Sequence, residues 1–299
     1  MELLRFLEGV RTPFFDWFFA TITKLGEETF LILIALFLIW CVNKKHGYYL
    51  FTVGFVGLTI NQFLKITLRE PRPWVKDPQF TIVESARAKA TGFSFPSGHT
   101  QISVGLYGSI ARFCKNRLVR TLCLVLAVLI PFSRLYLGVH TLADVLFSVL
   151  IACILIFAIQ PLIYNHFEQS RVMNLLFFGM AVLGVLYVLY ISLFPFPADV
   201  DAINLQDAVE NGYKMLGATL GLWLSYGIDM RYIRFETKAV WWAQLLKFLL
   251  GSVLFLALRF VLKAALPATE LFGAVRYFLL VLAAMTAWPF TFRFLPTQK

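Results

Sequence analysis

The sequence predicts an all-α fold, a polytopic bundle of transmembrane helices, on two observations, and its cysteine spacing argues against two alternatives. Hydrophobic residues make up 59% of the 299 residues and charged residues only 15%, which excludes an ordinary soluble globule. Apolar runs recur about every 25 to 35 residues, each near the length that a helix needs to cross a bilayer. The four cysteines show no C-x-x-C spacing, so neither a disulfide framework nor a zinc site is indicated. We therefore expect one integral membrane domain over residues 1–299.

The first expected element is an N-terminal interfacial helix over residues 1–25. This segment is amphipathic and rich in aromatic residues, but Asp16 and Lys24 interrupt its apolar pattern, so a cleavable signal peptide is not expected. About nine spans follow, and Pro131 and Pro161 lie near span ends, where helix breakers belong. The expected spans cover residues 28–43, 48–67, 98–113, 118–132, 139–164, 172–194, 211–228, 239–262 and 272–292.

The net charge of +10 lies mostly in loops between the apolar runs. That placement points to anionic head groups and phosphate as partners rather than to nucleic acid, although part of the charge serves to set the topology. The short loops 44–47 and 112–120 hold six Lys and Arg residues and no acid, and early short loops weigh most in the positive-inside rule. We expect these loops in the cytoplasm and the chemical motifs on the extracytoplasmic face of the plasma membrane.

The first of these motifs is Ser133-Arg134-x5-His140-x3-Asp144, at the start of the fifth span. His140 and Asp144 are four residues apart, so on a helix their side chains share a face and can meet. A carboxylate that accepts a hydrogen bond from one imidazole nitrogen leaves the other nitrogen free to attack. The alternative is a polar pair that satisfies itself within the bundle. Ionisable residues inside a membrane are functional by default, so we favour a reactive pair with Arg134 one to two turns away.

The second motif is Pro96-Ser97-Gly98-His99, at the start of the third span. The free N–H groups of a first helical turn form an anion site, Ser97 adds a hydroxyl, and Gly98 lets the backbone approach a ligand closely. His99 lies beside that pocket, where a general acid would protonate a departing alkoxide. Taken alone, such a turn is more often a simple helix cap.

The third motif is Lys65-x6-Arg72-Pro73, where the second span ends. Taken alone, it is typical of cations that extend toward the membrane surface. Arg72 differs because it lies between two prolines, which stiffen the backbone that presents it. Arg binds phosphate as a two-pronged fork and Lys binds it as a point charge, so the pair is complementary.

Taken in order, the three motifs match the pattern of the type 2 phosphatidic acid phosphatase superfamily without a mismatch. The chain resembles this group, which includes lipid phosphate phosphatases, undecaprenyl pyrophosphate phosphatases, glucose-6-phosphatases and vanadium haloperoxidases. The resemblance covers about residues 14–160, which we take as the phosphatase core. Residues 172–292 would add helices that many bacterial members lack, although glucose-6-phosphatases share a nine-span plan. These helices would widen a lipid groove, form a homodimer or carry a second activity, and the sequence favours none of these three roles over the others.

The resemblance implies a role for each site residue. His140 would attack phosphorus and form a phosphohistidine, oriented by Asp144, and His99 would protonate the leaving group and later activate water. The phosphoryl oxygens would be held by Lys65, Arg72, Ser97, Gly98 and Arg134. No metal or other cofactor is expected, because one Lys and two Arg would stabilise the developing charge. His46 and His166 match no motif and are expected in interfacial loops.

The favoured function is therefore hydrolysis of a membrane lipid phosphate or pyrophosphate, of the undecaprenyl pyrophosphate or phosphatidic acid type. The loop 73–95 is expected to shape the substrate entrance. A sugar-phosphate phosphatase and a lipid phosphotransferase would use the same residues. An anion or lipid transporter is the alternative from another class. It is disfavoured because the polar residues gather at one membrane face rather than near the midplane, where transporter sites lie.

Overall fold

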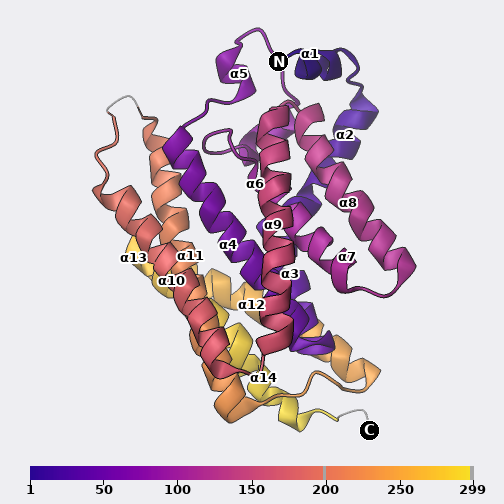
Figure 1. The fold of residues 1–299 in the computed structure, drawn as a ribbon, viewed down its shortest axis with the longest axis vertical. Coiled ribbons are helices and arrows are strands. Elements are labelled where there is room, and N and C mark those ends of the chain that lie inside the picture. Colours follow the sequence, from indigo (N-terminus) through magenta and orange to yellow (C-terminus); the bar gives the residue numbers. More distant parts are fainter. Residues whose placement is uncertain (198–199, 297–299) are drawn as a thin grey trace. The chain divides into compact units, whose positions relative to one another are not determined.

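The structure is a computed structural model that describes residues 1–197 and 200–296, and in this part of the chain all regular elements are helices (Figure 1). The all-α prediction is confirmed. In the N-terminal half the elements are α1 (Glu2–Gly9), α2 (Pro13–Ile22), η1 (Thr23–Gly26), α3 (Glu28–Phe37), η2 (Leu38–Val42), α4 (Lys44–Leu68), α5 (Pro73–Lys76), η3 (Glu84–Lys89), α6 (Gly98–Ser103), η4 (Val104–Gly108), α7 (Ser109–Phe113) and α8 (Arg117–Tyr136). The remaining elements are α9 (Leu142–His166), α10 (Ser170–Leu193), α11 (Ala202–Ile228), η5 (Asp229–Ile233), α12 (Trp241–Ala265), α13 (Glu270–Leu282), η6 (Ala283–Ala287), α14 (Trp288–Phe290) and η7 (Thr291–Phe294).

Each of the nine segments expected to span the membrane is helical, but fewer qualify as spans. Six helices of the described residues are long and apolar enough, and a seventh is obtained if Pro13–Gly26 and Glu28–Val42, which meet at 51°, form one broken span. Segments 98–113 and 211–228 are helical yet do not qualify, so the count of nine stays a prediction. The six qualifying spans are Lys44–Lys76, Arg117–Tyr136, Leu142–His166, Ser170–Leu193, Trp241–Ala265 and Glu270–Phe294.

Residues 1–25 do not form the single helix that the sequence suggested. The chain breaks at Thr12, which has an extended backbone and whose hydroxyl accepts a hydrogen bond from the Phe15 amide, and Pro13 then opens α2. The result is a short helix α1 and a separate α2 that leads toward α3. The interfacial position of this segment stays a prediction.

The described residues form two compact units, and the first contains 1–31, 52–159, 196–197 and 200–208. Within it α8 packs against α1, α2, α6, η4 and α7. Pro131 and Pro161 lie near the ends of α8 and α9, as expected, but both lie inside the helix and do not end it. Neighbouring helices can support a proline inside a membrane helix, which explains why these prolines do not end the helices.

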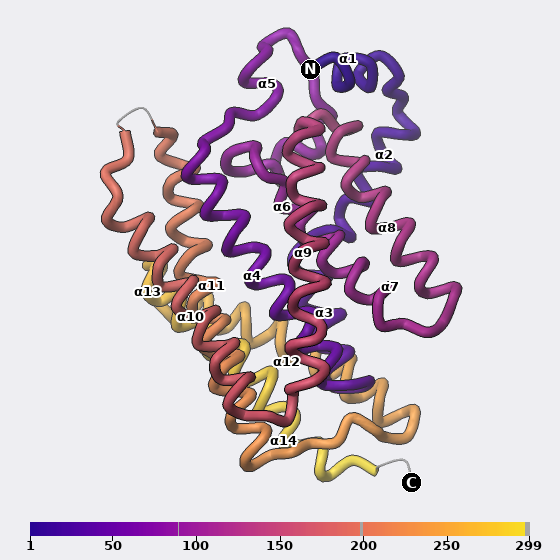
Figure 2. Tube along the Cα trace, in the orientation of Figure 1, coloured from indigo at the N-terminus to yellow at the C-terminus, as the bar shows by residue number. Residues whose placement is uncertain are grey.

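Helix α1 and the loop after α4 form a cap on unit 1, and both lie at the same end of the unit in Figures 1 and 2. Leu4 and Leu7 of α1 are buried in one apolar cluster with Phe80 of the loop and with the end of α8. Polar contacts add to this packing: Arg5 forms an ion pair with Asp77 at 2.5 Å. The loop 73–95 is therefore folded and anchored at this end of the unit.

The second unit contains 32–51, 160–195 and the described residues from 209 onward. Close helix approaches at glycine positions hold it together. A Cβ added at Gly217 of α11 would lie 2.0 Å from the Ala274 carbonyl oxygen of α13, and one at Gly221 would lie 2.8 Å from the Phe278 carbonyl oxygen. A Cβ added at Gly212 of α11 would likewise lie 2.8 Å from the Tyr187 ring of α10, and Figure 2 shows α10 and α11 running side by side. Small residues at such spacing let membrane helices pack backbone against backbone.

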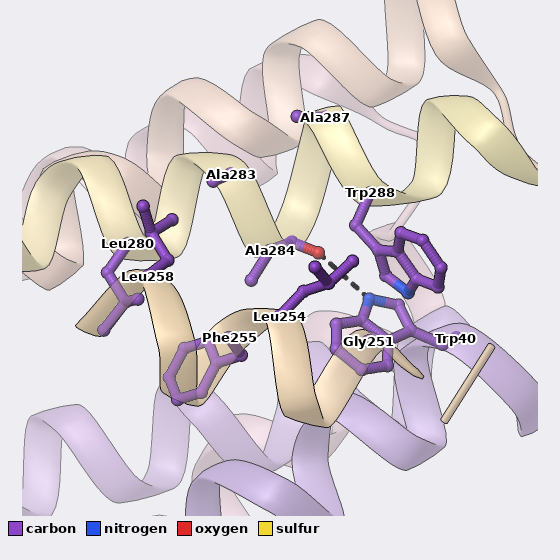
Figure 3. Close-up of a pocket in the computed structure, with 10 residues that line it drawn as sticks. All are labelled: Trp40, Gly251, Leu254, Phe255, Leu258, Leu280, Ala283, Ala284, Ala287 and Trp288. Carbon is purple, nitrogen blue, oxygen red and sulfur yellow. Dashed lines mark hydrogen bonds between the residues drawn. The ribbon is translucent and has the colours of Figure 1, made fainter. Parts of the chain in front are cut away.

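Unit 2 also contains a partly open apolar cavity of about 260 Å³ between α12 and the α13–η6–α14 segment (Figure 3). The indoles of Trp40 and Trp288 lie at one end of it, and the Trp40 Nε1 donates to the Ala284 carbonyl oxygen at 3.0 Å. The remaining lining residues are Gly251, Leu254, Phe255, Leu258, Leu280, Ala283, Ala284 and Ala287.

Candidate active site

The eight residues that the sequence singled out all belong to unit 1, and the fold brings their three motifs together. The His140 motif is positioned by the end of α8. The chain turns at Gly138, whose φ of +79° is unfavourable for other residues, and the Val139 amide donates to the Arg134 carbonyl oxygen at 3.2 Å. A Cβ at Gly138 would also meet Arg11 Nη2 at 2.7 Å. This turn ends α8 and places His140 immediately before α9.

His140 and Asp144 form the expected pair. The His140 Nδ1 lies 3.3 Å from Asp144 Oδ2, and both side chains are almost fully buried. The same carboxylate oxygen accepts hydrogen bonds from the Thr141 amide at 2.8 Å and the Ser94 hydroxyl at 2.6 Å. Three donors thus converge on one oxygen, which fixes the carboxylate and through it the imidazole.

Arg72 links the Lys65-Arg72 motif to His140. Its Nη1 lies 3.0 Å from His140 Nε2 and also donates to the Val139 carbonyl oxygen at 2.9 Å. Because a guanidinium can only donate, the His140 Nε2 must accept, and the imidazole proton is therefore on Nδ1, facing Asp144. Burial, followed by the positive charge of Arg72, lowers the pKa of His140 well below its usual value of 6.5. A neutral imidazole with its Nε2 lone pair available is the form that can act as a nucleophile.

Arg72 and Lys65 are held by neutral backbone oxygens rather than by acids. Arg72 donates to the carbonyl oxygens of Gly92 at 3.1 Å and Thr91 at 2.6 Å, and the Lys65 ammonium donates to that of Phe93. These bonds orient both cations without neutralising them. Both side chains are buried, at 6% and 9% exposure, so their positive charge acts where solvent screening is weak.

Arg134 and His99 both have buried polar atoms without a partner among the described residues. Arg134 is 1% exposed and donates from Nη1 to the Thr23 hydroxyl at 2.8 Å, while its Nε and Nη2 have no hydrogen-bond partner among the described residues. The His99 Nε2 is also buried without a partner there. His99 lies within electrostatic range of both Arg134 and His140. Buried unpaired donors are costly unless a ligand or water meets them, so these atoms mark where an anion would bind.

The Ser97-Gly98-His99 turn meets the other motifs at the start of α6. Ser97 is the N-cap residue, and its hydroxyl accepts from the Thr100 amide at 3.4 Å, as the helix-cap interpretation expected. The Ser97 amide donates to the Asp144 carbonyl oxygen at 3.2 Å, which ties α6 to α9. A Cβ at Gly98 would meet no protein atom closer than Asn61 Oδ1 at 3.8 Å, so packing within the protein does not require glycine here. The space left at Gly98 fits close approach of a ligand to the backbone.

Sequence reasoning missed several residues that complete the site. Ser94 and Thr23 position Asp144 and Arg134. Asn61 is 1% exposed and Gln101 is 3% exposed, and neither side-chain amide has a hydrogen-bond partner among the described residues. Asn61 precedes Lys65 by four residues, so its polar side chain on the same face of an apolar helix was a signal available in the sequence.

The two remaining histidines lie at helix ends, not in loops. His46 lies in the first turn of α4 and its Nδ1 pairs with the Tyr164 hydroxyl; His166 is the last residue of α9. The loop prediction was wrong because α4 starts at Lys44 and α9 extends to His166. Among the described residues there is no group of three or more His, Cys, Asp or Glu side chains that could hold a metal ion.

Comparison with known families gives two matches along the chain. Residues 45–168, which contain all eight candidate residues, match the family model described as the PAP2 superfamily. Residues 213–299 match a second model, described as the transmembrane extension of PAP2 superfamily phosphatases.

Several curated proteins are similar in sequence. An undecaprenyl-diphosphatase, BcrC, of Bacillus subtilis is 34% identical over 126 residues, which cover 42% of this chain and 62% of that protein. A probable sphingosine-1-phosphate phosphatase of Dictyostelium discoideum is 28% identical over 73% of this chain and 56% of its own length. Phosphatidylglycerophosphatase B of Bacillus subtilis is 29% identical over 50% of this chain and 76% of its own length. The chain thus spans less than two thirds of the first two relatives. No solved structure matches the chain.

Proposed function

The chain belongs to the PAP2 superfamily, and on this premise we propose that it is an integral membrane phosphatase that hydrolyses the phosphate or diphosphate head group of a lipid. The observation that carries the proposal is the state of His140: its Nδ1 faces Asp144 and its Nε2 faces Arg72. An imidazole held in this way directs its Nε2 lone pair at the Arg72 guanidinium, so a phosphoryl group bound by Arg72 would displace this hydrogen bond and meet the lone pair.

In the first step, His140 Nε2 attacks phosphorus and a P–N bond forms while the P–O bond to the leaving group breaks. His99 gives a proton to the departing oxygen, because its buried Nε2 has no partner within the described residues. Arg72, Lys65 and Arg134 stabilise the charge on the phosphoryl oxygens, and the start of α6 contributes the Gly98 backbone N–H and the Ser97 hydroxyl, because the Ser97 amide already donates to Asp144. Asp144 stabilises the imidazolium that forms when His140 becomes phosphorylated.

In the second step, His99 accepts a proton from water and the hydroxide attacks phosphorus. The P–N bond breaks, inorganic phosphate leaves and His140 returns to the neutral form. The developing charge is met by one Lys and two Arg, so we propose a reaction that needs no metal ion.

A lipid substrate is supported by the surroundings of the site and by its relatives. Five of the eight candidate residues, Lys65, Arg72, Arg134, His140 and Asp144, lie at or beside the ends of α4, α8 and α9, each of which is part of a candidate membrane span. The other three lie at the start of α6. A lipid can therefore present its head group there while its chains stay in the bilayer. The relatives are named for undecaprenyl diphosphate, sphingosine-1-phosphate and phosphatidylglycerophosphate, all of which join a phosphate to a long apolar chain. We place the site on the extracytoplasmic face of the plasma membrane, from the loop charges described above.

A phosphate-release panel on the purified protein in detergent tests this proposal. We expect release from undecaprenyl diphosphate, phosphatidic acid, phosphatidylglycerol phosphate or sphingosine-1-phosphate, and little release from glucose-6-phosphate. Release from glucose-6-phosphate alone would favour a sugar-phosphate phosphatase, and transfer of phosphate to an added alcohol would favour a phosphotransferase. No release from any ester, including p-nitrophenyl phosphate, would favour the transporter alternative.

The same assay tests the mechanism. Vanadate adopts the trigonal-bipyramidal geometry of the phosphoryl group in transfer and should inhibit, whereas EDTA should not. Acid-labile phosphate should be trapped on His140 when the reaction is quenched in alkali. Loss of activity with EDTA that magnesium restores would contradict the metal-free mechanism.

A further inference from the structure

We propose that unit 2 contains a binding site for an anionic membrane phospholipid, formed by a basic pocket for the phosphate and the adjoining apolar cavity for an acyl chain. This site lies within unit 2 and uses none of the proposed catalytic residues. It therefore goes beyond the proposed function and does not depend on it.

The basic pocket encloses about 200 Å³ next to the start of α12 and the end of α14. Four cations line it, Arg234, Lys238, Lys247 and Arg293, against a single acid, Glu236. None of the four cations forms an ion pair with another described residue. Such an excess of unpaired positive charge is the recognition chemistry of a phosphate group.

Lys247 gives the pocket a fixed charge. Its side chain is 1% exposed, and its ammonium donates to the carbonyl oxygens of Glu236 and Thr237, both at 3.1 Å. It also lies 4.6 Å from the centre of the Phe292 ring. These contacts hold the loop before α12 in place and leave the charge without a counter-ion, so an anion in the pocket would meet a cation that is already oriented.

Exposed aromatic residues indicate the level of the pocket in the membrane. Tyr232, Trp241 and Phe294 are 71%, 75% and 74% exposed, and all three lie beside the pocket in the sequence. Trp and Tyr gather where membrane spans meet the head groups. A phosphate bound among these cations would therefore lie at head-group level, as the phosphate of a phospholipid does.

The apolar cavity lies next to the basic pocket along α12. Lys247 lines the pocket, and Gly251, one turn further, lines the cavity. Trp288 joins the two, since its Nε1 donates to the Lys247 carbonyl oxygen at 3.0 Å while its ring lines the cavity beside Trp40 (Figure 3). From Lys247 to Leu258 the helix rises about 16 Å. The site thus presents cations, then an indole, then aliphatic side chains, in the order of the phosphate, glycerol and acyl chain of a phospholipid. A free phosphate ion would need only the cations.

Native mass spectrometry of the full chain tests the site. The protein is purified in detergent and exposed to an equal mixture of phosphatidylglycerol and phosphatidylcholine, with vanadate present so that lipid in the proposed active site is not counted. We expect the wild type to retain one phosphatidylglycerol in preference to phosphatidylcholine. The double variant Lys238→Gln/Arg293→Gln should retain about one tenth or less of the phosphatidylglycerol that the wild type retains. The variant Ala283→Leu, which fills the cavity, should show a similar loss of bound phosphatidylglycerol.

Two matched controls separate the site from general effects. Arg231→Gln removes a neighbouring charge outside the pocket, and Ala257→Leu enlarges an exposed residue on another face of α12; both should retain the lipid as the wild type does. Helical circular dichroism on every variant establishes that it is folded. Equal retention by the double variant and the wild type would overturn the phosphate pocket. Displacement of the lipid by millimolar inorganic phosphate, or full retention by a folded Ala283→Leu protein, would overturn the acyl-chain part.

Discussion

At the scale of single residues, the candidate site holds His140, Arg72 and Lys65 in fixed orientations before a substrate binds. His140 contacts an acceptor on one side and a donor on the other, and these two partners together fix its tautomer. Arg72 and Lys65 are oriented by carbonyl oxygens, which leaves their charge for an anion. Preorganised groups of this kind need little rearrangement in the transition state.

Replacement of His140 by Ala should reduce turnover by several orders of magnitude, because no other side chain at that place can form the phosphoenzyme. Loss of a single donor that holds a phosphoryl oxygen should cost less, about 10²–10³ in kcat. The measurement is steady-state phosphate release. His166→Ala, at the end of α9 and far from the motif in sequence, is the matched control and should keep wild-type activity. A His140→Ala protein with a tenth of the wild-type rate would rule out the nucleophile assignment.

The imidazole of His140 should titrate below pH 6.5. Its pKa is lowered by burial and by Arg72, so the neutral form persists as the pH falls through the usual range and protonation occurs only at a lower pH. NMR of ¹⁵N-histidine-labelled protein can follow this step, with the His140 signal assigned by its absence in His140→Ala. A midpoint at or above 6.5 would contradict the description of a neutral nucleophile.

The sequence was sufficient to identify the residues with distinctive chemistry at this scale. His140, Asp144, His99 and the cations stood out because ionisable side chains are rare within apolar helices. Ser94, Thr23 and Asn61 did not stand out, since hydroxyl and amide side chains are common in membrane helices and loops. Their roles arise from contacts between segments far apart in the chain, such as Ser94 with Asp144 or Thr23 with Arg134.

At the scale of helices, local signals predicted most elements, and tertiary packing explains the errors. The end of α8 depends on Gly138, a turn signal that sequence analysis passed over because the motif continues through it. Pro131 and Pro161 were expected near span ends as helix breakers, yet α8 and α9 continue past them. By contrast, Thr12 and Pro13 are a common N-cap and first residue of a helix, and they start α2, which separates it from α1.

Replacement of Gly217 by Val should destabilise the packing of α11 on α13. The added Cβ would lie 2.0 Å from the Ala274 carbonyl oxygen, and a backbone atom cannot move aside cheaply. We expect a loss of at least about 1–3 kcal/mol, the usual cost of overpacking. Thermal unfolding in detergent measures it. Gly227→Val in the same helix has open space at its Cβ and should change stability little beyond its helix propensity. Equal melting temperatures for the two variants would argue against this helix contact.

At the scale of the whole molecule, the chain is a multi-span membrane protein, and its orientation is the main open prediction. The fold changes the argument for that orientation. Lys44 forms a buried ion pair with Asp229 at 2.6 Å, and Lys45 pairs with Glu168 at 3.5 Å, so these two lysines are not unpaired loop charges. The remaining support comes from the loop 112–120, where Lys115, Arg117 and Arg120 are exposed.

Cysteine accessibility in intact cells tests the orientation. In a background without the four native cysteines, Gln79→Cys on the motif side should react with an impermeant maleimide, because we place that loop outside. Lys115→Cys should react only after the cells are opened. Both positions are exposed, so neither label depends on unfolding. The opposite labelling pattern would mean that the membrane orientation is reversed and that the substrate is a lipid of the inner leaflet.

Holding three cations with neutral carbonyls and hydroxyls has a consequence for the enzyme between turnovers. Lys65, Arg72 and Arg134 lie within electrostatic range of one another, so without an anion they repel each other at low dielectric. In the proposed reaction inorganic phosphate is the last product to leave, and its negative charge would relieve this repulsion. Phosphate should therefore raise the melting temperature relative to chloride at equal ionic strength, by mass action on the folded state. The same affinity would slow the release of phosphate, so the product would inhibit the proposed reaction. The rate in a cell would then fall as the local phosphate concentration rises, and it would also depend on the supply of lipid.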